Sequence, residues 1–308
     1  MRFRISDLPH VVSPTYCEIF NTVAYYKIHE NSNSVFLSVY ENEEIVSVCH
    51  FNEIEPGVFV SPYKGTFGGI DFCSKLDIVS VEEVILLIVN FLIKKSAKRI
   101  VLNMPPFCHN PGKSAYFLNN LLLNKFIIER CEINHHIIID EVPLFEKMMR
   151  NNKKRLKKCI SENFIFQQVH SIQEYSKVYD IIKRNRSEKG YDISMTFEQI
   201  MKMKETFHAE VYFFKTTFDF LDVASSICIR INSNVLYVFY WGDLSAYKEY
   251  SPIVHLANGI YDFAKENNYK MLDAGTSSIK GELNYGLCKF KENLGFSASN
   301  KLSFRYDI

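Results

Sequence analysis

Hydrophobic and polar positions in the first half of the chain predict a strand meander followed by alternating helices and strands. Two runs rich in apolar and β-branched residues, 35–40 and 45–54, flank a polar turn at 41–44, which is the pattern of a β-hairpin. Beyond the hairpin, the pattern predicts a strand, a glycine-containing loop, a helix, a strand, a second helix and a last strand, at 58–61, 65–69, 81–97, 99–103, 113–124 and 127–140.

The second half repeats this order of elements after a basic segment. The pattern predicts a strand, two helices and a three-strand meander, at 164–169, 172–189, 197–207, 209–215, 220–231 and 235–241. Asn232-Ser233-Asn234 supplies hairpin turn residues, and Pro252 begins a predicted helix at 252–267. A strand at 270–273, a helix at 283–293 and a strand at 299–306 follow. We therefore predict two α/β (α+β) domains, 1–144 and 145–308, each a mixed, mostly antiparallel sheet flanked by helices.

The basic segment 147–163 is predicted to be an amphipathic helix that opens the second domain. Phe145, Met149, Leu156 and Ile160 would line one face. The opposite arc carries Lys147, Arg150, Lys154, Lys157 and Lys158. Such an arc is either a solvated face or a surface for the phosphates of a nucleotide, coenzyme A or a tRNA acceptor stem. It has no interleaved aromatic residues, so stacking on single-stranded nucleic acid is not favoured.

Residues 272–296 are the most informative stretch of the chain. A short apolar strand ends on Asp273, and a small-residue turn, 274–278, follows it. A polar loop then leads into a helix with Lys289 and Lys291, and Gly295 is expected to end that helix. A carboxylate and lysines beside such a turn suggest a site for an anionic or carbonyl-bearing ligand. Alternatively, Asp273 caps the turn and the lysines lie in solvent.

This segment resembles the C-terminal signature of the Fem-type (FemAB-like) peptidoglycan aminoacyltransferases and their shorter acyltransferase relatives. The signature is D-x-G-x-S, a loop, and G-L-x-x-F-K-x-x-x-G, matched by Asp273, Gly275, Ser277, Gly286, Leu287, Phe290, Lys291 and Gly295. The basic segment and the stretches 186–191 and 240–242 fall where that family has comparable elements. The resemblance covers most of 145–308, and it implies tandem GNAT-like domains.

The resemblance also implies an activity, which is N-acyl or aminoacyl transfer to an amine of a cell-envelope precursor or amino sugar. The donor would be acyl-CoA or aminoacyl-tRNA, so tRNA is a candidate partner, and no metal is implied. Neither half contains the Arg/Gln-x-x-Gly-x-Gly loop that binds coenzyme A pyrophosphate, which leaves the donor open. Two alternatives remain: a CoA-dependent N-acetyltransferase for a small amine or peptide, and a catalytically silent nucleotide-sugar-binding protein.

Site residues follow from the resemblance, position by position. Lys291 would stabilise an oxyanion or a phosphate, and Asp273 would organise the turn and the lysine. Substrate-binding positions would be Arg186, Tyr191, Tyr240, Gly275, Thr276, Ser277 and Lys289. Contacts to phosphate, coenzyme A or tRNA would come from Arg150, Lys154, Lys157 and Lys158. No residue is assigned as the general base.

Composition narrows the class of protein further. The 308 residues carry a formal net charge of +1, so the chain as a whole is not a polyanion binder and DNA is not an expected partner. Its eight cysteines form no Cys-x-x-Cys pair, and the adjacent His135 and His136 fall in one strand, so no metal site is predicted. The longest apolar run, 84–93, is too short to span a bilayer, and the N-terminus lacks a signal-peptide pattern. We therefore expect a cytoplasmic protein.

Overall fold

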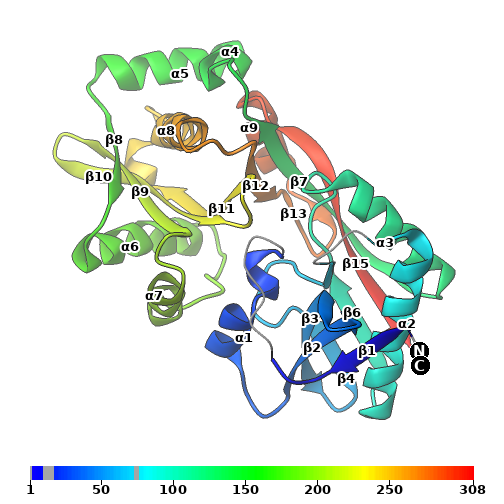
Figure 1. Cartoon of the computed structure of the whole chain (residues 1–308). Coiled ribbons are helices and arrows are strands. Elements are labelled where there is room, and N and C mark those ends of the chain that lie inside the picture. Colours follow the sequence, from blue (N-terminus) through cyan, green and yellow to red (C-terminus); the bar gives the residue numbers. More distant parts are fainter. Residues whose placement is uncertain (1, 10–16, 73–75) are drawn as a thin grey trace. The chain divides into compact units, whose positions relative to one another are not determined.

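The computed structural model describes residues 2–9, 17–72 and 76–308, which form two compact units. Unit 1 comprises 1–133, 278–282 and 299–308, and unit 2 comprises 134–277 and 283–298. Strands β7 (Ile127–Ile138) and β15 (Ser297–Asp307) each contribute residues to both units (Figure 1). The structure thus divides the chain differently from the predicted single boundary at 144/145, because the last strand returns to unit 1.

Unit 1 is built on a mixed sheet with the strand order β1-β2-β3-β4-β6-β15-β7, and β5 pairs with β3. The strands not yet bounded are β1 (Phe3–Ser6), β2 (Ser34–Glu41), β3 (Glu44–Glu55), β4 (Val58–Ser61), β5 (Ile70–Phe72) and β6 (Arg99–Asn103). The pairing of β4 with β6 is parallel, whereas β1–β2, β2–β3, β3–β4, β3–β5 and β6–β15 are antiparallel.

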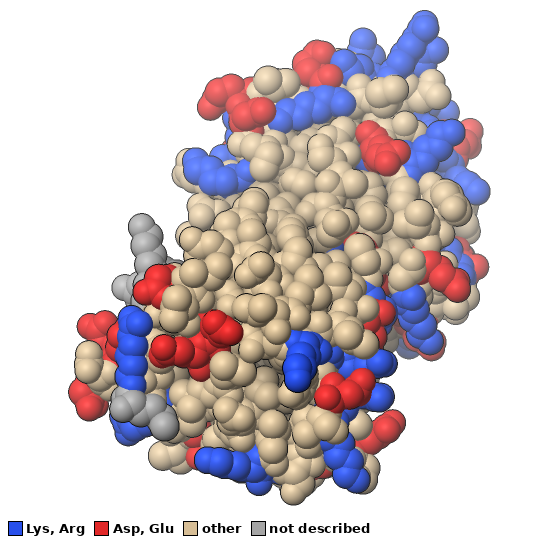
Figure 2. All heavy atoms as spheres, turned by 90° about the vertical axis from the view of Figure 1, so that its right-hand side faces the viewer, with Lys and Arg blue, Asp and Glu red and all other residues tan. Residues whose placement is uncertain are grey.

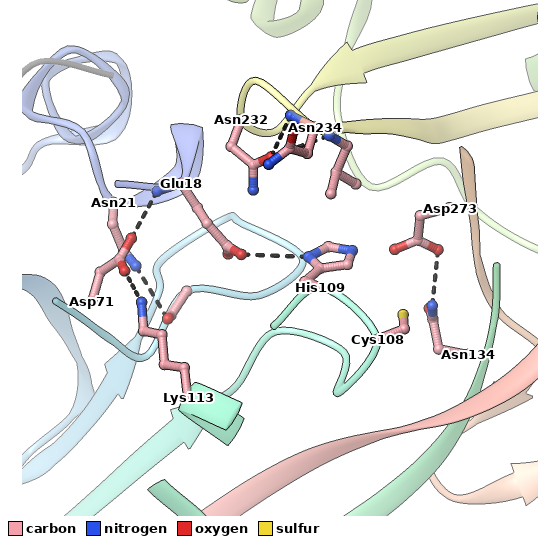
Figure 3. A network of polar contacts seen from close by, with 12 residues as sticks. Glu18, Asn21, Asp71, Cys108, His109, Lys113, Asn134, Asn232, Asn234 and Asp273 are labelled. Atoms are coloured by element: carbon pink, nitrogen blue, oxygen red, sulfur yellow. Dashed lines mark hydrogen bonds and ion pairs between the residues drawn. The ribbon is translucent and has the colours of Figure 1, made fainter. Parts of the chain in front are cut away.

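Helices cover both faces of this sheet. Helices α2 (Ile78–Lys94) and α3 (Pro111–Leu123) bury their apolar faces in the main core of the unit. On the other face, α1 (Val23–His29) packs Tyr26 against Phe36 and Val48. Asp71 of β5 accepts a hydrogen bond from the Glu18 amide at 2.7 Å and forms an ion pair with Lys113 of α3 (Figure 3). This carboxylate joins the segment before the 3-10 helix η1 (Ile19–Asn21) to α3.

Unit 2 repeats the plan with the strand order β7-β12-β11-β10-β9-β8. Its strands are β8 (Ile165–Val169), β9 (Val211–Phe218), β10 (Leu221–Arg230), β11 (Val235–Asp243) and β12 (Met271–Thr276). Helix α8 (Pro252–Glu266) covers one face, with α5 (Arg150–Ser161) outside it, and α6 (Ile172–Glu188) and α7 (Phe197–Thr206) lie on the other side (Figure 1). Parallel pairing occurs between β11 and β12.

Most predicted elements are confirmed, with boundaries shifted by a few residues. The strand 99–103 matches β6, and Asn232 Oδ1 accepts the amides of Asn234 and Val235 in the predicted hairpin turn (Figure 3). The predicted elements omitted β1, η1, α1, β5 and the 3-10 helix η2 (Ser245–Tyr247). These elements are short, and their apolar positions make too few turns or alternations to form a period.

Two local predictions were wrong. The basic segment is not one helix: α4 (Leu144–Lys147) and α5 are separated by Met148 and Met149, which have extended backbone. Of the expected apolar face, Leu156 is buried, together with Asn152 and Cys159, whereas Met149 and Ile160 are about 60% exposed. The second error concerns the expected turn at 274–278, because β12 continues to Thr276 and a hairpin, β13 (Ser278–Ile279) with β14 (Glu282–Leu283), follows.

Candidate active site at the end of strand β12

Strands β11 and β12 stop pairing before either of them ends. Their parallel register runs from Val235 opposite Met271 to Tyr237 opposite Asp273. Beyond that point β11 continues to Asp243 and β12 to Thr276. The backbone edges of the two strands therefore separate at Asp273, at the carboxyl end of a parallel pair, where ligands commonly bind in α/β sheets.

A β-bulge at the same point redirects the end of β12. Opposite β7, Asp273 pairs with His136 and Thr276 with Asn134, so β12 has one residue more than its partner. Gly275 accommodates the bulge with a φ of +73°, a conformation that glycine adopts without strain. Asp273 Oδ1 accepts the Gly275 amide at 2.7 Å. It also accepts the Asn134 side-chain amide at 2.8 Å (Figure 3). The fully buried Asp273 carboxylate thus organises the bulge.

The bulge turns two carbonyl oxygens toward Lys291. The amino group of Lys291 donates to the oxygen of Gly275 at 2.8 Å and to that of Thr276 at 2.9 Å. Only 1% of Lys291 is exposed, and it is the one buried residue of α9 (Tyr285–Asn293), all of which is described. A lysine ammonium has three N–H donors, so these two bonds leave one direction of Nζ for another partner.

Hydrogen bonds hold helix α9 at both ends, and they therefore fix the position of Lys291 in the interior of unit 2. Asn284 caps the helix by accepting the Leu287 amide, and its own amide donates to the Ser277 carbonyl at 2.9 Å. At the other end, Gly295 has a φ of +95° and the Phe296 amide donates to the Lys291 carbonyl. The expected helix stop at Gly295 is confirmed.

A buried serine–histidine pair lies next to the bulge. Ser277 Oγ and His135 Nδ1 are 2.8 Å apart, and neither residue is exposed. His135 Nε2 is also buried and makes no hydrogen bond to any part of the chain that the structure describes. The sequence offered no signal for this pair, because His135 and Ser277 are 142 residues apart and meet only through the pairing of β7 with β12.

Burial shifts the protonation equilibria of both basic side chains. Removal from water lowers the pKa of Lys291 to about 7, against the opposing charge of Asp273. Burial also lowers the pKa of His135 to about 4, and the charges of Lys291 and His136 add to that effect. His135 is therefore neutral at physiological pH, whereas Lys291 is near the midpoint of its titration.

Arg186 and Tyr240, which the resemblance implicated, lie together elsewhere in unit 2. The Arg186 guanidinium carbon is 4.9 Å from the centre of the Tyr240 ring, a cation–π contact. The buried Tyr240 hydroxyl hydrogen-bonds Ser194, a residue that the sequence did not single out. Burial raises the pKa of Tyr240. Tyr191 donates its amide to the Arg186 carbonyl, but its side chain is 41% exposed.

The remaining predicted positions lie on the surface of unit 2. Lys289 is exposed on α9, and the basic residues of α5 are exposed as well, namely Arg150, Lys154, Lys157 and Lys158. Lys158 stacks on Tyr250 and lies 3.9 Å from Glu249, and Lys157 lies over Phe145. The face drawn in Figure 2 carries both basic and acidic side chains near its top. Because Glu249 lies beside Lys158 and Glu146 forms an ion pair with Lys153, the surface around α5 is not purely basic.

The described residues contain no group of three or more His, Cys, Asp or Glu side chains placed to hold a metal ion. Within the same ranges, no helix combines the length and the hydropathy needed to cross a bilayer.

Comparison with known proteins finds similarity in structure and not in sequence. No family model matches the chain, and no curated protein matches it. FemX superimposes with a TM-score of 0.75 at 10% identity, over 99% of this chain and 97% of FemX. L-PGS from Bacillus licheniformis gives 0.60 at 11% identity, over 88% and 83% of the two chains. A tandem GNAT protein from the clavulanic acid biosynthesis pathway gives 0.52 at 8%, over 90% and 84%. The chain therefore has the Fem-like tandem GNAT fold, as its sequence predicted.

Proposed function

We propose that this protein transfers an acyl or aminoacyl group to an amine of a cell-envelope precursor. The observation that carries the proposal is the buried Lys291 amine, held by the bulge of β12 where β11 and β12 stop pairing. A buried basic group with a strongly shifted pKa is more frequent at active sites than elsewhere. The Fem-like fold and the D-x-G-x-S and F-K-x-x-x-G residues support the same class of reaction.

The chemistry requires little covalent participation from the protein. The acceptor amine attacks the carbonyl carbon of a thioester or an aminoacyl ester, and a tetrahedral oxyanion forms before the leaving group departs. Catalysis of this step depends on orientation and on polar groups near the reacting atoms. Lys291 would contact the reacting groups, and Asp273, Gly275, Thr276 and Ser277 would hold it in place.

Substrate binding would involve the Arg186–Tyr240 cluster and the exposed residues of helices α5 and α9 in unit 2. Arg186 and Tyr240, with Tyr191 and Lys289, would bind the acceptor. Arg150, Lys154, Lys157 and Lys158 of α5 would contact phosphates of aminoacyl-tRNA or acyl-CoA. Such contacts weaken as salt rises, because counterions are released when phosphates are bound.

The test is an acyl-transfer assay with the full chain and one donor at a time. Acetyl-CoA and a charged tRNA, each labelled in the acyl group, are incubated with a UDP-linked envelope precursor that bears a free amine, and the acceptor is analysed by mass spectrometry. We expect one donor to add its acyl mass to the acceptor, and Lys291→Met to abolish the addition. An unmodified acceptor with both donors, or full activity of Lys291→Met, contradicts the proposal.

A further inference from the structure

We propose that helix α2 of unit 1 is the surface through which two copies of this chain form a two-fold symmetric dimer. The exposed face of α2 would be covered by the same helix of the second copy, packed antiparallel to it. This inference concerns unit 1 alone and does not depend on the proposed acyl transfer.

Helix α2 is apolar on both of its sides. Twelve of its 17 residues are Ile, Val, Leu or Phe. One side is packed in the core of unit 1, where Val84, Ile85 and Leu92 are fully buried. A helix that is apolar all round is expected to be covered all round, because each exposed apolar side chain forgoes the free energy of burial. In the described chain, the opposite side of α2 remains exposed.

The exposed side carries a regular apolar stripe. Val79, Leu86 and Ile93 are 59%, 40% and 37% exposed. They follow one another at intervals of seven residues, so at 3.6 residues per turn they lie within about 40° of one another around the helix. Between them are the half-buried Glu82 and the exposed Asn90. Apolar residues at this spacing form the seam along which two helices pack side by side.

The stripe is symmetric about Leu86. When Leu86 faces Leu86 of the second copy in an antiparallel pair, Val79 faces Ile93 and Glu82 faces Asn90. The first of these pairs is apolar, and the second joins a carboxylate to an amide that can donate to it. A polar pair within an apolar seam fixes the register of two helices. The stripe therefore has the self-complementarity that a two-fold interface requires.

Charges at the two ends of α2 favour the same arrangement. Asp77 caps the first turn and Lys95 follows the last one, so antiparallel pairing places opposite charges together, whereas parallel pairing would place like charges together. Within the chain, Lys95 lies 3.4 Å from Asp7 in an exposed ion pair. Asp77 accepts the Ser80 amide and interacts electrostatically with Arg2. Exposed contacts of this kind are weak, so both charges can also serve a partner.

Helix α3 extends the apolar surface beside α2. The side-chain amide of Asn124, at the end of α3, donates to Glu82 of α2 at 3.4 Å. Next to Asn124 in α3, Leu122 and Leu123 are 47% and 67% exposed. A stable interface buries about 800 Å² on each partner, so α3 adds area that the stripe needs. Aliphatic contacts of this kind suit a second copy, because homodimer interfaces are more apolar than those of transient complexes.

The oligomeric state of the full chain in solution tests the proposal. We expect sedimentation equilibrium from about 1 to 100 µM to show a dimer whose fraction rises with concentration. Leu86→Glu places two carboxylates against each other on the two-fold axis and should weaken association at least about 100-fold. Ile160→Glu is the matched control, at an isoleucine of α5 that is 59% exposed, and should associate as the wild type does. Thermal unfolding shows whether each variant is folded.

Cysteine crosslinking tests the antiparallel register. A residue on the two-fold axis meets itself, so Leu86→Cys should form a disulfide-linked dimer under mild oxidation. Val79→Cys should not crosslink alone but should do so when mixed with Ile93→Cys. The variants are made with Cys131→Ser, because Cys131 is an exposed native thiol. Crosslinking of Val79→Cys to itself would show parallel packing and overturn the proposed arrangement.

The other occupants of α2 are outcomes that overturn the proposal. A monomer at every concentration does so directly. If that monomer sediments with vesicles of phosphatidylglycerol and phosphatidylcholine, and Leu86→Glu does not, a bilayer covers α2 instead of a second copy. A dimer that Leu86→Glu leaves intact uses another surface and also contradicts the proposal.

Discussion

Each unit contains one equivalent parallel strand pair, β4–β6 in unit 1 and β11–β12 in unit 2, and the chain beyond the end of the pair differs between the two units. In unit 1, β4 pairs with β6 along its whole length, from Val58 opposite Arg99 to Ser61 opposite Leu102. The chain then closes over the next residue: the Gly68 amide donates to the Asn103 carbonyl at 2.8 Å. Gly69 lies so close to Met104 that a Cβ atom would be 2.4 Å from the sulfur. The glycine loop thus satisfies the backbone at the end of this strand pair.

Unit 2 has a bulge and a buried lysine where unit 1 has its loop. The Asn103 side chain accepts hydrogen bonds from the Ser303 hydroxyl at 2.8 Å and from Arg130 at 3.5 Å, and it donates to the Ser61 carbonyl at 3.3 Å. Around the bulge of β12, two carbonyls instead hold the Lys291 amine. In unit 1, backbone groups of the glycine loop satisfy the end of the parallel strand pair. In unit 2, the Lys291 amine occupies the equivalent place, and its removal from water costs free energy.

The largest effect on stability is expected from crowding the loop of unit 1. Gly69→Ala places a Cβ against Met104 at a φ of +61°. We expect a loss of about 2–4 kcal/mol, from overpacking and from the left-handed backbone. Gly281→Ala has the same backbone penalty with nothing within 4 Å, so it should cost only about 1 kcal/mol. Urea unfolding measures both, and equal losses would show that the loop does not pack tightly.

A slightly smaller effect should appear in the pH dependence of stability, because the buried Lys291 in unit 2 titrates at a different pH in the folded and unfolded chains. The pKa of Lys291 is about 7 in the folded chain and near 10.5 in the unfolded chain, so the unfolded state binds more protons between these values. The free energy of unfolding therefore rises with pH through this window, by at most about 1.4 kcal/mol per unit. Between pH 7 and 9 the wild type should gain about 2–3 kcal/mol relative to Lys291→Met. Parallel curves for the two proteins would show that Lys291 is not buried as described.

The smallest effect concerns the bulge itself. Gly275→Ala introduces a Cβ 3.3 Å from the Tyr237 ring at a φ of +73°, and should cost about 1–2 kcal/mol. Gly190→Ala has a φ of +75° and no neighbour within 4 Å, so it isolates the backbone contribution. The difference between the two unfolding energies measures the Tyr237 contact. A larger loss for Gly190→Ala would mean that the bulge does not require glycine.

Local chemistry was sufficient for predictions that depend on neighbours in sequence. The hairpin at Asn232, the helix stop at Gly295 and the strand β6 follow from turn residues, capping and a short continuous apolar run, each of which spans only a few positions. The prediction of one amphipathic helix over 147–163 was wrong because a helical wheel assumes a continuous helix. The extended backbone at Met148 and Met149 breaks that continuity, and the Met149 amide bonds the Asn293 carbonyl far along the chain.

The sequence by itself determined the order of the elements, the repetition of one plan in two halves and the segment that carries the candidate site. The tertiary structure alone decided that Lys291 is buried, that β12 bulges beneath it, and that His135 meets Ser277. The physical reason is that periodicity reports which face of an element is apolar, whereas a pKa and a hydrogen-bond partner depend on atoms brought close by sheet pairing. A lysine on a helix is ordinarily solvated, and only its neighbours in space removed this one from water.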